Sequence, residues 1–80
     1  MSIQPKSPTM STEEVATILR SIGVHTSATR IREGISQGKY PFGIVIQFAT
    51  PIYEIYRKDF EAWALEKFYV SENELYSAVS

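Results

Sequence analysis

The side chains best suited to contact a ligand lie between Thr26 and Lys39, where hydroxyl, amide and basic groups gather. An arginine there offers a planar fork of donors that fits the edge of guanine or a phosphate, and a lysine offers a point charge. Hydroxyls and backbone N–H groups at the start of a helix also bind phosphate. The candidate DNA-binding residues are Thr26, Ser27, Thr29, Arg30, Arg32, Gln37 and Lys39.

Several of these candidates have a second, purely structural interpretation. Thr26 and Ser27 stand where a helix cap is needed, and capping is the simpler role. Arg32 lies closer to the buried flank of its helix, so an intramolecular pair with a carboxylate is an equal alternative. Arg30 and Lys39 are also compatible with solvated surface positions.

Catalytic chemistry has little support in this chain. His25 is the only histidine and Asp59 the only aspartate, and there is no cysteine. A histidine-based triad, a multi-histidine metal site and a thiolate metal site therefore cannot be built. The four glycines do not form a phosphate-binding loop pattern. We expect no enzyme, no catalytic residue, no metal site and no cofactor.

A first helix is predicted over about residues 12–22. Ser11 is positioned to cap it, with Glu14 at the reciprocal position of a capping box. Val15, Ile18, Leu19 and Ile22 form one apolar stripe at helical spacing. Gly23 ends the helix, and Val24 can fold back on Leu19.

A second helix is predicted over about residues 27–37, with Ala28, Ile31 and Ile35 on its buried face. Thr29, Arg30, Glu33 and Gln37 then point away from that face. Gly34 in the middle costs up to about 1 kcal/mol relative to alanine, so this helix depends on packing for its stability. Gly38 ends it.

Beyond Pro41 the apolar period changes from helical to two residues, which predicts a β-hairpin with strands near 44–48 and 52–56. We expect its tyrosines, with Tyr40, to be half-buried. A third helix follows near 58–68, with Phe60 and Trp63 in the core. Ser71 and Glu74 repeat the capping-box spacing before a last short helix from Leu75 to Val79.

This order resembles the excisionase-type, MerR-like winged-helix proteins of phages and mobile elements. Four features carry the resemblance: Ser11 to Ala16, the arginine-bearing second helix, Lys39 to Gly43, and Tyr53 to Trp63. The resemblance implies an α+β winged helix-turn-helix domain that binds double-stranded DNA with its second helix in the major groove and its hairpin on the adjacent backbone or minor groove. It further implies an accessory factor of recombination or a small transcription regulator, with an integrase or a second copy on DNA as partner.

Chain length and composition fit a single domain. We divide the chain into a flexible lead-in (1–9), a winged-helix domain (10–68) and an acidic C-terminal extension (69–80). No membrane-spanning or secretory segment is visible, so we expect a cytoplasmic protein.

Charge leaves a second function open. The net charge is −1, although residues 20–58 carry six basic and two acidic side chains and the remainder from Asp59 is acidic. A basic region of this kind favours phosphate contact. The hairpin tip from Gln47 to Ile52 has no basic residue, however. The alternative is a protein-interaction module on the same scaffold without strong DNA affinity.

Overall fold

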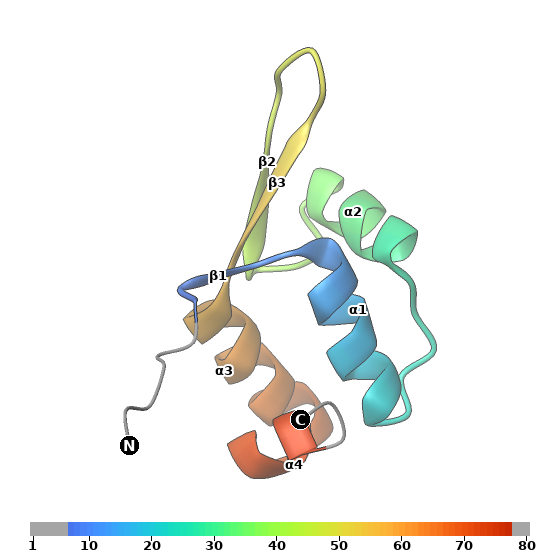
Figure 1. Cartoon of the computed structure of the whole chain (residues 1–80), viewed down its shortest axis with the longest axis vertical. Helices are drawn as coiled ribbons and strands as arrows, with labels where there is room; N and C mark the ends of the chain where they lie inside the picture. Colours follow the sequence, from blue (N-terminus) through green and yellow to red (C-terminus); the bar gives the residue numbers. More distant parts are fainter. Residues whose placement is uncertain (1–6, 78–80) are drawn as a thin grey trace.

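Over the described residues, the computed structural model shows a small α+β domain in which a three-stranded sheet and four helices surround one core (Figure 1). In chain order the elements are β1 (Thr9–Met10), α1 (Thr12–Ser21), α2 (Ala28–Ser36), β2 (Gly43–Ile46), β3 (Ile52–Tyr56), α3 (Arg57–Phe68) and α4 (Glu72–Ser77). The three predicted longer helices and the two predicted strands are confirmed.

The structure describes residues 7–77. The first part of the predicted lead-in and the predicted end of the last helix, at Val79, lie outside the described residues. No helix within residues 7–77 combines the length and apolar content needed to cross a membrane.

The sheet is antiparallel and has the strand order β1-β3-β2. The β2–β3 hairpin is the predicted one, with Val45 opposite Tyr53. Strand β1 is an addition to the prediction, because two residues are too few to show a period in the sequence. Its residue Met10 pairs with Ile55, and both side chains are buried.

Helix α1 begins at its predicted cap, where Ser11 Oγ accepts a hydrogen bond from the Glu14 backbone N–H at 3.0 Å. The reciprocal half of the predicted capping box is wrong. The Glu14 carboxylate instead accepts a hydrogen bond from Arg57 Nη2 at 2.9 Å. A buried arginine is a stronger partner for a carboxylate than a backbone N–H that water can reach.

Both long helices of the N-terminal half end as predicted at glycines with positive φ, Gly23 (95°) and Gly38 (71°). After α1 the Val24 N–H donates to the Leu19 carbonyl at 3.0 Å, which closes the turn. After α2 the Lys39 N–H donates to the Gly34 carbonyl at 2.8 Å. These bonds satisfy carbonyls that a helix end otherwise leaves open, and glycine alone enters this conformation without strain.

Close packing explains why a glycine, Gly34, lies in the middle of α2. A Cβ atom there would lie 2.6 Å from Tyr40 Cδ2 and closer still to Cε2. The Tyr40 ring in turn stacks on Phe42, with centroids 4.9 Å apart. The glycine therefore lets the chain after α2 return tightly over its own helix.

Aromatic rings join the loop before β2 to α3. Phe42 and Phe60 are both fully buried and meet edge to face, with centroids 5.4 Å apart. The rings of Trp63 and Phe42 have centroids 4.9 Å apart, but Trp63 is only partly buried. The prediction that Trp63 lies inside the core is therefore wrong, and the residue lies at the margin of the core. Its outer face lines a surface hollow, described below.

Helix α4 completes the core at the end away from the hairpin (Figure 1). The predicted capping box is present: the Ser71 N–H donates to Glu74 Oε1 at 2.9 Å, and the Glu74 N–H donates to Ser71 Oγ at 3.1 Å. Leu75 is fully buried against α1 and α3. The described part of the C-terminal extension is thus packed into the domain.

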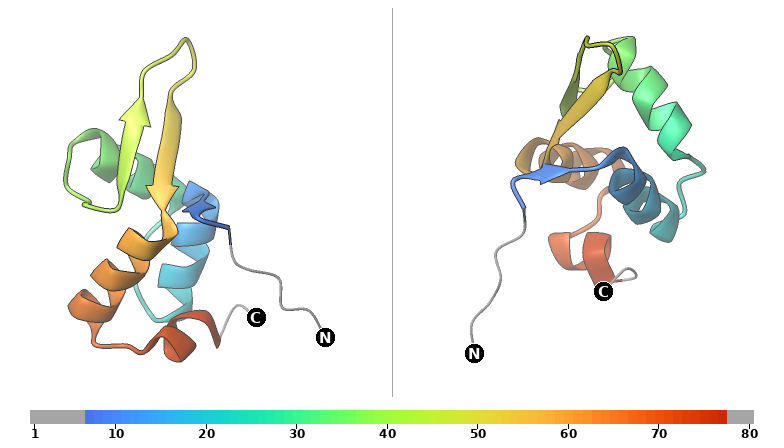
Figure 2. Two further views of the ribbon diagram at one scale, coloured as in Figure 1. Left: turned by 90° about the vertical axis from the view of Figure 1, so that its left-hand side faces the viewer. Right: turned by 45° about the horizontal axis from the view of Figure 1, so that its top comes forward.

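The hairpin rises beyond the helices, beside α2 (Figures 1 and 2). Gly43 lies on its inner face, because a Cβ atom there would be 3.1 Å from Ile35 Cδ1 of α2. Ile44 and Ile52 occupy the other face and are each about half exposed. The outer face of the hairpin therefore carries the exposed Ile44 and Ile52 together with Glu54, which lies directly opposite Ile44.

Candidate nucleic-acid interface

The outward side of α2 is polar along its length. Its exposed residues are Thr29, Arg30, Glu33, Ser36 and Gln37, followed by Lys39 after the helix. Their spacing follows one side of a 3.6-residue period, opposite the buried Ile31 and Ile35. The predicted division of α2 into a buried and an outward face is confirmed.

Ser27 is the cap of α2, as the simpler interpretation predicts. Its Oγ accepts a hydrogen bond from the Arg30 backbone N–H at 3.3 Å. Thr26 precedes it and is half-buried, with its carbonyl accepting a bond from Arg20 Nη1 at 3.3 Å. Arg20 is thereby held beside the start of α2, where the helix N–H groups already favour anions.

Arg30 is the candidate best placed for an external contact. It is exposed, and its guanidinium has no hydrogen-bond or ion-pair partner among residues 7–77. Lys39, just past the other end of α2, is exposed and likewise unpaired within the described chain. Gln37 lies between them as the C-cap residue, with an exposed side chain.

Arg32 makes the intramolecular pair that the sequence leaves as an alternative. Its Nη1 lies 3.3 Å from Glu13 Oε2 and 3.1 Å from Thr12 Oγ1, across to the first turn of α1. Its Nη2 also lies 3.4 Å from Thr29 Oγ1. With its donors used in this way, Arg32 links the two helices rather than facing outward.

The pKa of Glu13 is lowered from its ordinary value. The largest cause is its own backbone N–H at the start of α1, followed by the Thr12 hydroxyl and then the Arg32 charge. A carboxylate that stays charged here favours both the helix start and the pair with Arg32. The cluster is therefore a structural link between α1 and α2.

Arg57 is the residue whose role the sequence misses. It is counted with the basic region, yet only 9% of it is exposed. Its Nε donates to the Ser7 carbonyl at 2.6 Å, and its guanidinium also binds Glu14 and the Tyr76 hydroxyl. These partners are 50, 43 and 19 residues away in the chain, so no local spacing could reveal them.

Pairing of Arg32 and Arg57 reduces the positive charge that the domain offers outward. Near α2 the unpaired cations are Arg30 and Lys39, with Arg20 partly engaged through a backbone carbonyl. The hairpin adds no cation: its large exposed side chains are Ile44, Phe48 and Ile52, and its one charged residue is the acidic Glu54. The surface therefore combines a few cations on α2 with an apolar hairpin.

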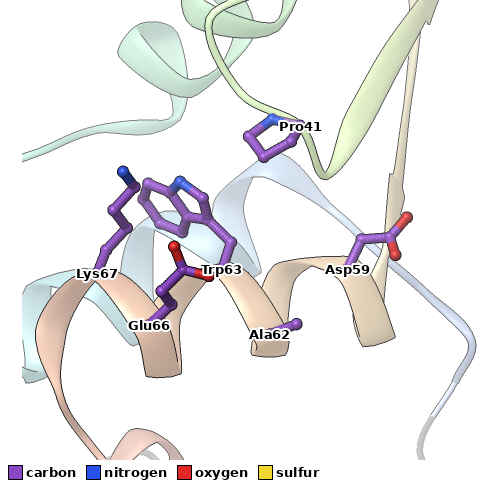
Figure 3. A pocket seen from close by; sticks show the side chains of 6 residues that line it. All are labelled: Pro41, Asp59, Ala62, Trp63, Glu66 and Lys67. Carbon is purple, nitrogen blue, oxygen red and sulfur yellow. The ribbon is translucent and has the colours of Figure 1, made fainter.

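The surface of the described chain is hollowed at the α1–α2 turn and beside α3. The hollow at the α1–α2 turn is formed by Arg20, His25 and their neighbours. The hollow beside α3 lies between α3 and Pro41 and is lined by Asp59, Trp63 and Glu66 among others (Figure 3). Within residues 7–77, no group of three His, Cys, Asp or Glu side chains is placed to hold a metal ion.

Comparison with known proteins identifies no family for this chain. No family model, no curated protein and no solved structure matches the chain.

Proposed function

We propose that this chain binds double-stranded DNA as a winged helix-turn-helix domain, in which α1 and α2 form the helix-turn-helix and the β2–β3 hairpin is the wing. The supporting observation is the outward face of α2, which carries the unpaired Arg30 and lies beside the projecting hairpin (Figure 2). An α-helix of this size fits the major groove, where arginine reads guanine. The resemblance to excisionase-type proteins suggests an accessory factor of recombination or a small transcription regulator of a phage or mobile element.

In this arrangement different residues of α2 and of its two ends contact bases and phosphates. Arg30 reaches a base edge or a phosphate, with Thr29 and Gln37 as further polar contacts in the groove. Lys39 and Arg20 bind phosphates at the two ends of the helix, and the N–H groups beside Thr26 and Ser27 support the contact near Arg20. Arg32 is left out, because its donors are used within the domain.

The hairpin contributes through apolar contact rather than charge. Ile44, Phe48 and Ile52 are exposed on it, and such side chains can pack on deoxyribose or at the edge of a groove. With so few cations, affinity for random sequence is modest and depends weakly on salt compared with strongly basic domains.

Fluorescence-anisotropy titration of Arg30→Ala tests this arrangement. Loss of a base contact weakens binding to a preferred site by about 1–3 kcal/mol and relaxes sequence preference, whereas loss of a phosphate contact weakens all sequences alike. Lys67→Ala is the matched control, because it removes one exposed cation from α3. Equal weakening by both variants would mean that binding follows net charge and not the face of α2.

The second candidate function is a protein-interaction module on the same scaffold. The observation that favours it is the combination of an exposed apolar hairpin with two arginines held in internal pairs. A module of this kind would show no salt-dependent affinity for duplex DNA, and loss of Phe48 would weaken partner binding more than loss of Arg30.

A further inference from the structure

The hollow between α3 and Pro41 has a composition different from that of the α2 face. Asp59, Ala62, Trp63 and Glu66 line it from α3, at the i, i+3, i+4, i+7 spacing of one side of the helix. Pro41 closes it from the loop before β2, and Lys67 stands at its end (Figure 3). The hollow therefore has an aromatic and proline lining with acidic margins.

The indole of Trp63 packs against neighbouring rings and is nevertheless partly accessible. Rings pack against it on its inner side, with centroid distances of 4.9 Å to Phe42 and 5.4 Å to Phe68. Its N–H has no hydrogen-bond partner within residues 7–77, although no buried side-chain nitrogen or oxygen of those residues lacks one. The indole N–H is consequently open to solvent, and part of the ring lines the hollow.

The charged residues that line the hollow around this indole are two carboxylates and one lysine. Asp59 and Glu66 are exposed and have no ion-pair partner in the described chain. Seven residues of helix separate them, about 10 Å along the axis, with Trp63 between. Lys67 is the one cation that lines the hollow, so its net charge is −1.

We propose that this hollow binds an arginine side chain of a partner protein, with the guanidinium stacked on Trp63 and paired to Asp59 or Glu66. A guanidinium is planar, is weakly hydrated and forks to carboxylates, so it fits an aromatic surface with acidic margins better than lysine does. Two carboxylates repel phosphate, so nucleic acid is not the occupant. The site lies on α3 and does not depend on the proposed DNA contact of α2.

Trp63 is the only tryptophan of the chain, so its fluorescence reports this hollow directly. The probes are two short blocked peptides, acetyl-Gly-Arg-Gly-amide and the same peptide with citrulline, which keeps the shape of arginine and removes its charge. We expect the arginine peptide to change the Trp63 emission saturably in the millimolar range, and the citrulline peptide to bind at least threefold more weakly. Equal effects of the two peptides, or no saturable change with either, would overturn the proposal.

Substitutions of residues that line the hollow provide a second test. Glu66→Gln and Asp59→Asn remove one carboxylate each, and each is expected to weaken binding of the arginine peptide about threefold. Lys67→Gln removes the opposing cation and is expected to strengthen it about twofold. Glu33→Gln is the matched control, since it removes an exposed carboxylate from α2 and leaves the affinity unchanged.

Circular dichroism verifies that each variant keeps the fold before titration. Because these side chains are exposed and unpaired, their replacement leaves the melting transition within a few degrees of the wild type. If Glu33→Gln weakens binding as much as Glu66→Gln in folded protein, the peptide is attracted by overall charge and the assigned hollow is wrong.

Discussion

Replacing Arg57 by methionine tests the network that joins four parts of the domain. Methionine keeps an apolar chain of similar length and removes every donor of the guanidinium. The bonds lost are those to the Ser7 carbonyl, to the Glu14 carboxylate at 2.9 Å and to the Tyr76 hydroxyl. These contacts hold the start of the described chain, α1 and α4 against the first turn of α3.

The size of the effect follows from what each partner does afterwards. The Glu14 side chain is 42% exposed and regains water, while the Tyr76 hydroxyl keeps its bond to Glu61 at 2.6 Å. Three bonds at about 1 kcal/mol each, less the desolvation that the guanidinium no longer suffers, give a loss of about 2 kcal/mol. For a domain of this size that lowers the melting temperature by about 8–16 °C.

Thermal and urea unfolding of Arg57→Met measure this loss. Lys58→Met is the matched control, because Lys58 is the next residue and its side chain is exposed and unpaired within the described chain. This variant is expected to change the free energy of unfolding by less than about 0.5 kcal/mol. If the two variants unfold at the same temperature, Arg57 does not stabilise the domain and the reasoning from its contacts is refuted.

Other predictions follow from the helix packing and the aromatic margin. Gly34→Ala is expected to destabilise the domain by about 1–3 kcal/mol in urea unfolding, because the added Cβ displaces the Tyr40 ring. Ser36→Ala is the control, because Ser36 is exposed on the same helix. A Gly34→Ala variant more stable than the wild type would contradict the close approach of Tyr40 to Gly34. Trp63→Ala is expected to lose about 3 kcal/mol in the same assay, because four rings pack on a side chain that is only partly buried; an unchanged midpoint would contradict that packing. Burial and then the Glu61 carboxylate raise the pKa of Tyr76 to about 12, above the value of about 10 in an unfolded chain. The contribution of the protonated Tyr76 hydroxyl to stability is therefore complete below pH 10 and is lost as the pH rises toward 12. Melting temperatures of the wild type and Tyr76→Phe should therefore converge over that interval, and parallel curves would show that this hydroxyl is not coupled to folding.

Local signals in the sequence predict most of the elements. Ser27, Gly23 and Gly38 act through the backbone within a few residues of themselves, so the cap and the two helix ends could be located from residue type and spacing. The change of apolar period near Pro41 located the hairpin in the same way. These effects need no knowledge of what lies elsewhere in the fold.

Tertiary contacts account for what the sequence could not predict. Arg57 and Lys58 are adjacent basic residues, and only the fold makes the first a buried link and leaves the second exposed. Both faces of the hairpin carry large apolar side chains, so its pattern does not identify which isoleucines face outward. Trp63 has the spacing of a core residue, but whether a neighbouring element covers its outer face depends on the path of the loop at Pro41.

The salt dependence of binding to a random DNA duplex tests the proposed function most directly. With Arg20, Arg30 and Lys39 near phosphates, the logarithm of the association constant should fall with the logarithm of the salt concentration with a slope of about −2 to −3. Lys39→Ala should reduce the magnitude of that slope by about one. Wild-type protein that shows no salt-dependent association with duplex DNA would contradict the proposal and leave the protein-interaction module in its place.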